Sequence, residues 1–230
     1  MPFFWDPTYI FVLIGAAICL IAQGRMKSTF HKFQSVRSTS GLTGRDTAER
    51  ILQQNGLHDV QIQPVSGDLT DHYDPRTKTI SLSEATYNST SVAAIGVAAH
   101  ECGHALQHAK GYAPLGVRGA LLPVANFGSM LAWPVIIIGF LIGGQSALLL
   151  IDIGIILFSA AVLFQLVTLP VEFNASSRAL KALTATGILN EQEVGESKQV
   201  LSAAALTYVA GAAAMILQLL RLLILRDRRQ

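Results

Sequence analysis

The stretch "VAAHECGHALQH", Val97–His108, contains the pattern H-E-x-x-H. On a helix, His100 and His104 are ~40° apart around the axis, so they present their imidazoles on one face. Such a pair can bind Zn²⁺ through ring nitrogens. Glu101 lies beside the site without being a ligand, where it can accept a proton from water on the metal. The pattern therefore predicts a zinc-binding helix with Glu101 as general base.

The residues around this motif predict a helix that is buried almost all round. The run is rich in Ala and other apolar residues, Thr90 or Ser91 can act as its N-cap, and Gly111 ends it. A buried helix does not carry His, Glu and His on neighbouring faces unless other groups satisfy them. This setting favours a metal site over a chance match on a polar helix face.

The composition indicates a membrane protein. Of the 230 residues, 51% are hydrophobic and only 14% are charged, whereas soluble domains have about 25% charged residues. The net charge of +2 is small, and no basic stripe with interleaved aromatic residues is visible, which argues against a nucleic-acid partner. The two cysteines, Cys19 in an apolar run and Cys102 inside the motif, do not indicate a disulfide scaffold.

Four apolar stretches are long enough to be membrane helices. They are Thr8–Gln23, Leu121–Ile142, Leu148–Leu169 and Val200–Leu225. About 20 residues at ~1.5 Å per residue cross a bilayer core of ~30 Å. No Lys or Arg precedes the first stretch, which favours a retained anchor over a cleaved signal peptide. Arg221 interrupts the last stretch, so the sequence predicts three or four transmembrane helices and leaves the fourth open.

The basic residues predict which side of the membrane each segment faces. Several of them follow the first stretch, among them Arg25, Lys27 and Lys32, whereas the first ten residues and the turn at 143–147 have none. Cytoplasmic loops carry the excess of Lys and Arg. The regions 24–118 and 171–199 are therefore expected in the cytoplasm. If the last stretch crosses, the terminal "RDRRQ" lies outside, against this rule.

The region before the motif helix has the pattern of a small sheet. Residues 60–65 and 79–83 alternate apolar and polar side chains, and turn residues lie between 74 and 79. We expect a small antiparallel sheet beside the motif helix. The edge of the strand at 79–83 is expected to be able to pair with an extended peptide.

A catalytic zinc site needs a third protein ligand and an open position. His108 continues the i+4 series, but it lies a full turn further along the helix, where it would struggle to reach the same metal. Asp152 lies near the outer end of its membrane stretch, away from a cytoplasmic motif. Glu172 follows the third stretch as it returns to the cytoplasmic side. Glu172 is therefore the preferred third ligand.

A family resemblance covers essentially the whole chain. The segments that carry it are "DHYDPRTKTISLSEATYNSTSVAAIGVAAHECGHALQH" from Asp71, "LPVEFNASSRAL" from Leu169 and "LTYVAGAAA" from Leu206. The chain resembles the YugP-type family of bacterial membrane neutral zinc metallopeptidases. Through the glutamate segment it is also distantly similar to the HtpX-like and CAAX-processing membrane metalloproteases. The resemblance implies a gluzincin-like site with one Zn²⁺ on His100, His104 and Glu172.

Two positions depart from the patterns of these families. Ser176 stands where the HtpX-like pattern E-x-x-A-D has Asp, and Asn174 stands where the YugP-type family has Asp. These positions are expected to orient the metal ligands, so metal affinity or turnover can differ from that of the family. Gluzincins also supply an oxyanion donor, for which Tyr208 and His72 are the candidates.

The resemblance and the segments above together predict a mostly α integral membrane protein. Its zincin-like metallopeptidase core has a small antiparallel β-sheet and three or four transmembrane helices. The expected parts are an anchor at 1–23, a cytoplasmic zincin-like domain at 24–118, a membrane hairpin at 119–170, a cytoplasmic segment with the third ligand at 171–199, and an apolar helix with a basic tail at 200–230.

The expected activity is hydrolysis of peptide bonds by a zinc-activated water, at the cytoplasmic side of the cell membrane. The expected partners are the lipid bilayer and a peptide or membrane-protein substrate. The alternative is a catalytically inactive zinc-binding membrane scaffold. The intact Glu101 argues against the scaffold, because a structural zinc site needs no base.

Overall fold

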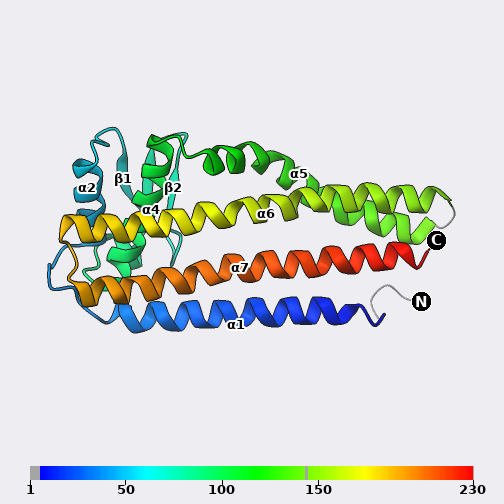
Figure 1. Cartoon of the computed structure of the whole chain (residues 1–230), viewed down its shortest axis with the longest axis horizontal. Helices are drawn as coiled ribbons and strands as arrows, with labels where there is room; N and C mark the ends of the chain where they lie inside the picture. The colour runs from blue at the N-terminus through cyan, green and yellow to red at the C-terminus, as the bar shows by residue number, and fades with distance from the viewer. Residues whose placement is uncertain (1–5, 143–144, 230) are drawn as a thin grey trace. The chain divides into compact units, whose positions relative to one another are not determined.

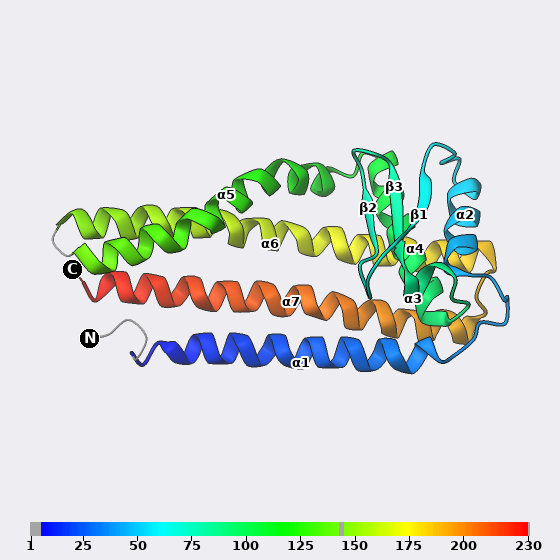
Figure 2. The same cartoon turned by 180° about the vertical axis from the view of Figure 1, so that it is seen from behind.

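The structure, a computed structural model, describes residues 6–142 and 145–229. The first five residues of the predicted anchor, the glycine pair of the predicted turn at 143–147 and Gln230 lie outside the described residues. The described part is mostly helical, as predicted. Its helices are α1 (Tyr9–Gln34), α2 (Gly44–Gln54), α3 (Glu84–Tyr87), α4 (Val92–Ala109), α5 (Ala113–Ile142), α6 (Gln145–Thr186) and α7 (Glu191–Asp227). Its strands are β1 (Gln61–Val65), β2 (His72–Asp74) and β3 (Thr79–Ser83) (Figures 1 and 2).

The chain divides into two compact units. The first, here called the membrane unit, comprises Met1–Gln23, Gly116–Pro170 and Thr207–Gln230. The second, here called the motif unit, comprises Gly24–Leu115 and Val171–Leu206. Helices α1, α5, α6 and α7 each contribute residues to both units.

Among the described residues, four helices are long and apolar enough to cross a membrane: α1, α5, α6 and α7. The fourth stretch, which the sequence left open, therefore has the length and composition of a span like the other three. Within the membrane unit, α5 and the adjoining parts of α6 and α7 run side by side around a core that contains Ile136, Ile151 and Leu222 (Figure 2). Helix α5 approaches α6 closely at Gly128, where an added Cβ would lie 2.7 Å from the carbonyl oxygen of Leu157. Small residues at such points let membrane helices pack tightly.

Arginines near the end of α7 have carboxylate partners inside the membrane unit. The Nε of Arg226 lies 2.8 Å from Oδ1 of Asp152, and an Nη of Arg221 lies 3.2 Å from Oδ2 of Asp6. Asp152, which the sequence raised as a possible metal ligand, is therefore engaged with a guanidinium. The two carboxylates partly neutralise the positive charge near the C-terminal end of α7. This lowers the desolvation cost of placing the two arginines in an apolar unit.

The sheet of the motif unit is present at the predicted positions but is mixed rather than antiparallel. Strand β3 lies in the centre, with β2 antiparallel on one side and β1 parallel on the other. All five residues of β3 are buried, including Ile80 and Leu82, so both of its edges need partners. The expectation that the edge of β3 could receive a peptide was therefore wrong, because β1 and β2 occupy both edges.

The motif helix α4 forms as its sequence predicts. The Oγ of Ser91 accepts a hydrogen bond from the backbone N–H of Ala94 at 3.1 Å, and Gly111 just beyond the helix has φ +58°. A left-handed residue after the helix is the usual way to end it, and Gly adopts that conformation without strain. Helix α4 packs against α2 and the sheet, and almost every residue before His108 is buried (Figures 1 and 2).

Candidate metal centre

Three predicted ligands converge in the motif unit. Ligand atoms of His100, His104 and Glu172 all lie within 4.8 Å of one another. The Oε2 of Glu172 is 3.3 Å from Nε2 of His100 and 3.6 Å from Nε2 of His104. The two imidazole rings are nearly perpendicular, with an interplanar angle of 89°. The two histidines come from adjacent turns of α4 and the carboxylate from α6, so the arrangement depends on how these helices cross.

Helices α4 and α6 cross where Gly103 meets Ala175. A Cβ built on Gly103 would lie 2.4 Å from the carbonyl oxygen of Ala175, which is closer than real Cβ atoms come. Only glycine therefore permits this approach of the two backbones. Gly103 lies between the two histidines in the chain, and Ala175 follows Glu172 by three residues, so the close crossing brings the three ligands together.

Gln107 fixes the ring of His104. Its side chain is completely buried, and its amide nitrogen donates to the carbonyl oxygen of Val171 at 2.7 Å and to Oδ1 of Asn174 at 3.0 Å. Because the amide nitrogen faces two acceptors, the amide oxygen must face Nδ1 of His104, 3.0 Å away. Nδ1 then carries the proton and donates it. This tautomer leaves the lone pair of Nε2 directed at the centre of the cluster.

Ser176 orients the ring of His100 as Gln107 orients that of His104. Its Oγ lies 3.1 Å from Nδ1 of His100, so the hydroxyl can accept the Nδ1–H and leave Nε2 free to bind a metal. The two positions that depart from the family patterns thus both contact the ligand network. Ser176 contacts a ligand directly, and Asn174 does so through Gln107. A hydroxyl polarises an imidazole less than a carboxylate does, which is the chemical consequence of Ser in place of Asp.

Glu101 is buried beside the ligands. Burial raises the pKa of its carboxyl group, His100 and His104 oppose this, and the carboxylates of Glu172 and Asp71 add to it. A raised pKa brings a carboxyl group closer to the neutral range in which it can exchange protons with water. The position next to the first histidine and the raised pKa are both what a general base requires.

The other candidate residues have contacts of their own. His108 is outside the cluster, and its Nδ1 lies 2.8 Å from the hydroxyl of Tyr73. His72 is exposed, and its Nδ1 lies 2.8 Å from the carbonyl oxygen of Thr70. Tyr208 belongs to the membrane unit, where its carbonyl oxygen accepts a hydrogen bond from Gln165. These contacts do not single out His72 or Tyr208 as the oxyanion donor, and both stay predictions.

Cys102 lies in the core, as expected from its place on α4. Its side chain is fully buried, and its thiol donates to the carbonyl oxygen of Ala48. Burial raises the pKa of the thiol strongly, and Glu101 adds to this. Because metals bind the thiolate form, a thiol held neutral in this way is a poor ligand. The candidate donor set is therefore two imidazoles and one carboxylate, a combination that suits zinc and would leave a position open for water.

Comparison with known proteins agrees with this chemistry. A family model described as "Putative neutral zinc metallopeptidase" matches residues 8–227. The chain belongs to this family. One relative, the "Putative membrane protease YugP" of Bacillus subtilis (strain 168), is 50% identical over 214 residues, which cover 93% of this chain and 94% of the relative. No solved structure matches. The resemblance to the YugP-type family is confirmed, and membership implies zinc as the metal and peptides as substrates.

Sequence reasoning did not find Gln107. The residue is three positions after His104, so spacing alone could have suggested a contact within one helix turn. Its burial and its partners on α6 depend on the crossing of the two helices, which the sequence does not display.

Replacing Gln107 is expected to weaken zinc binding. In Gln107→Leu, Nδ1 of His104 loses its acceptor and Asn174 loses a donor, so zinc affinity should fall about 10–100-fold. Competition with a chromophoric chelator measures this affinity. Gln53→Leu, an exposed change on α2, is the matched control and should bind zinc like the unmodified chain. Equal affinity in both variants would show that Gln107 does not hold the ligand in place.

Proposed function

We propose that the chain is a zinc-dependent metallopeptidase in which His100, His104 and Glu172 hold one Zn²⁺ and Glu101 is the general base. The observation that carries the proposal is the convergence of the three ligand atoms within 4.8 Å. Its support also comes from the buried Glu101 beside them and from membership of a family described as zinc metallopeptidases.

The chain's own residues supply the orientation and the proton transfer. When bound, zinc would acidify water in the site and polarise the peptide carbonyl. Gln107 and Ser176 hold the two imidazoles with Nε2 directed inward. A carboxylate oxygen of Glu101 accepts the proton of the attacking water as the C–O bond forms. The same oxygen then gives that proton to the nitrogen of the leaving amine as the C–N bond breaks.

The proposed setting is the cytoplasmic face of the cell membrane. Arg25, Lys27 and Lys32 follow the first membrane helix, and such residues favour the cytoplasmic side. The parts at 24–118 and 171–199 would form the active domain there, and the anchor, the hairpin and the C-terminal helix would hold it in the bilayer. The substrate is a peptide segment of a soluble or membrane protein.

An extended substrate has a different docking edge from the one expected from the sequence. Strand β2 pairs with β3 through one edge, and within the described residues its other edge carries no strand. Helix α4 contacts β2 directly. A peptide could therefore pair with β2 and still lie close to the motif helix.

The proposal is tested by proteolysis with the purified full-length chain in detergent. We expect cleavage of an unfolded protein substrate, loss of cleavage after treatment with a chelator, and recovery when zinc is restored. Cleavage that survives complete removal of metal would contradict a zinc-dependent reaction. Retained zinc without cleavage of any substrate in a broad peptide library would instead support the inactive scaffold.

A further inference from the structure

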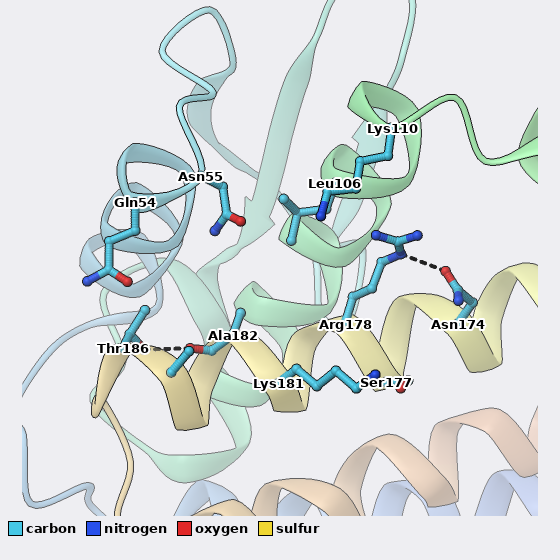
Figure 3. Close-up of a pocket in the computed structure, with 11 residues that line it drawn as sticks. Gln54, Asn55, Leu106, Lys110, Asn174, Ser177, Arg178, Lys181, Ala182 and Thr186 are labelled. Carbon is cyan, nitrogen blue, oxygen red and sulfur yellow. Dashed lines mark hydrogen bonds between the residues drawn. The ribbon is translucent and has the colours of Figure 1, made fainter.

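A cavity of about 400 Å³ lies in the motif unit between α2, α4 and α6 (Figure 3). Its lining includes Lys110 from the end of α4, Arg178 and Lys181 from α6, and the polar side chains Asn55, Asn174 and Ser177. The side chains of Lys110 and Arg178 extend into the space between α4 and α6, and the side chain of Lys181 runs along α6 beside Ser177 (Figure 3). The proposed peptidase chemistry uses none of the three cations.

The charge of this cavity is one-sided. No Asp or Glu lines it, and in residues 6–142 and 145–229 no carboxylate forms an ion pair with Lys110, Arg178 or Lys181. The Nε of Arg178 donates to Oδ1 of Asn174 at 2.7 Å, which leaves its two Nη groups for another acceptor. Lys110 and Lys181 are exposed and Arg178 is half-buried, so water and salt screen part of their mutual repulsion, and an anion bound among them would relieve the rest.

The cavity lies on the other flank of the α4–α6 crossing from the metal ligands. Successive helix residues are ~100° apart, so Leu106 and Lys110 lie on the opposite side of Gly103 from His100 and His104. On α6, Arg178 and Lys181 likewise lie on the opposite side of Ala175 from Glu172 and Ser176. The cavity is therefore not a continuation of the metal centre, and a peptide at the metal would not enter it directly.

A hydrogen-bond chain nevertheless joins the two flanks. Arg178 donates to Asn174, Asn174 accepts from Gln107, and Gln107 accepts from His104. Each of these hydrogen bonds restricts the orientation of the two side chains that it joins. A group that holds the guanidinium of Arg178 in place therefore also helps to hold the ring of His104 with Nε2 inward.

We propose that this cavity binds a phosphoryl group and that its occupancy strengthens metal binding through Arg178, Asn174, Gln107 and His104. A phosphoryl group carries up to two negative charges and offers three oxygens, which matches three cations together with the hydroxyl of Ser177 and the amide of Asn55. The guanidinium of Arg178 can bind two of these oxygens in parallel. The phosphoryl group can belong to a soluble compound or to the headgroup of an anionic phospholipid.

The coupling rests on the proposed metal site, whereas the binding does not. By thermodynamic linkage, a phosphoryl group that raises zinc affinity must itself bind more tightly to the zinc-loaded chain than to the metal-free chain, by the same factor. Both affinities can be measured without any peptidase assay. Failure of this inference is therefore distinguishable from failure of the proposed function.

The test uses the full chain in nanodiscs of neutral phosphatidylcholine and titrates inorganic phosphate by calorimetry. We expect saturable binding that weakens at least about tenfold in the double variant Lys110→Gln/Lys181→Gln, because each lysine contributes a charge-assisted contact. The matched control is Arg50→Gln/Lys198→Gln, which removes the same total charge from exposed positions outside the cavity and should bind phosphate like the unmodified chain. Circular dichroism, measured on every sample, reports whether the double variant stays folded.

A second arm identifies the source of the phosphoryl group. Native mass spectrometry of the chain in mixed micelles measures retention of phosphatidylglycerol relative to phosphatidylcholine. Retention of phosphatidylglycerol that depends on Lys110 and Lys181, without binding of inorganic phosphate, would assign the site to a lipid headgroup, and the reverse would assign it to a soluble compound. Absence of both, or equal losses in the double variant and its control, would overturn the site. Equal phosphate affinity with and without zinc would overturn the coupling.

Discussion

Glu101→Gln is expected to lower peptide hydrolysis about 10²–10⁴-fold while the chain keeps its zinc. The substitution retains the size of the side chain and removes its ability to accept a proton. Glu101 lies next to His100 on α4 but is outside the group of three ligand atoms, so its neutral amide should leave metal binding intact. The amide has nearly the size and shape of the carboxyl group that it replaces, so the variant should fold.

The measurement compares turnover of one fluorogenic peptide by the zinc-loaded variant and by Glu49→Gln, an exposed change of the same kind on α2. Glu49→Gln should hydrolyse the peptide like the unmodified chain. If Glu101→Gln retains full activity with full zinc, another group takes the proton. If it loses its zinc, Glu101 supports the metal site itself, and the assigned ligand set is incomplete.

Gly103→Ala is expected to disrupt the metal centre without altering any ligand. The new methyl group would lie 2.4 Å from the carbonyl oxygen of Ala175, which is backbone and cannot rotate away. Helices α4 and α6 must therefore separate, at a cost of ~1–3 kcal/mol of folding free energy. The same displacement moves Glu172 away from His100 and His104. Zinc affinity should fall together with thermal stability.

Gly195→Ala is the control for this variant. Gly195 lies inside α7, and an added Cβ there meets no atom within 4 Å. Alanine in a helix is favoured over glycine by ~0.5–1 kcal/mol, so this variant should be as stable as the unmodified chain or slightly more stable. Thermal unfolding followed by circular dichroism, with zinc content on the same samples, measures both effects. Normal zinc content and stability in Gly103→Ala would show that the crossing does not need glycine.

The parts of the fold set by local pattern were predictable from the sequence. The H-E-x-x-H spacing, the cap at Ser91 and the apolar stretches each depend on residues within a few turns of one another, and the structure has a helix at each place. Glu172 could be proposed as a ligand because it follows the third membrane stretch, which is expected to return the chain to the same side of the membrane as the motif helix. Even so, the sequence suggested that the third membrane helix ends near Leu169, whereas α6 continues through Pro170 to Thr186.

Features that depend on packing between distant segments were not predictable. The parallel pairing of β1 with β3 follows from the full burial of β3, and strand periodicity does not reveal which neighbours a strand has. Gln107 had the pattern of an ordinary polar residue near a helix end. Its role depends on Val171 and Asn174, which lie 64 and 67 residues away in the chain. The cavity at Lys110 and Arg178 depends on the same crossing.

X-ray absorption at the zinc edge is the sharpest test of the proposed ligand set, because it detects the donor atoms around the metal in the intact chain. We expect one zinc with two imidazoles and otherwise only oxygen donors, at distances of ~2.0–2.2 Å. The imidazole signal should weaken or the metal should be lost in His104→Ala. A sulfur donor at ~2.3 Å would put a cysteine on the metal, and three imidazoles would add a third histidine to the ligands. Either result, or a chain that binds no zinc, would contradict the assignment of His100, His104 and Glu172.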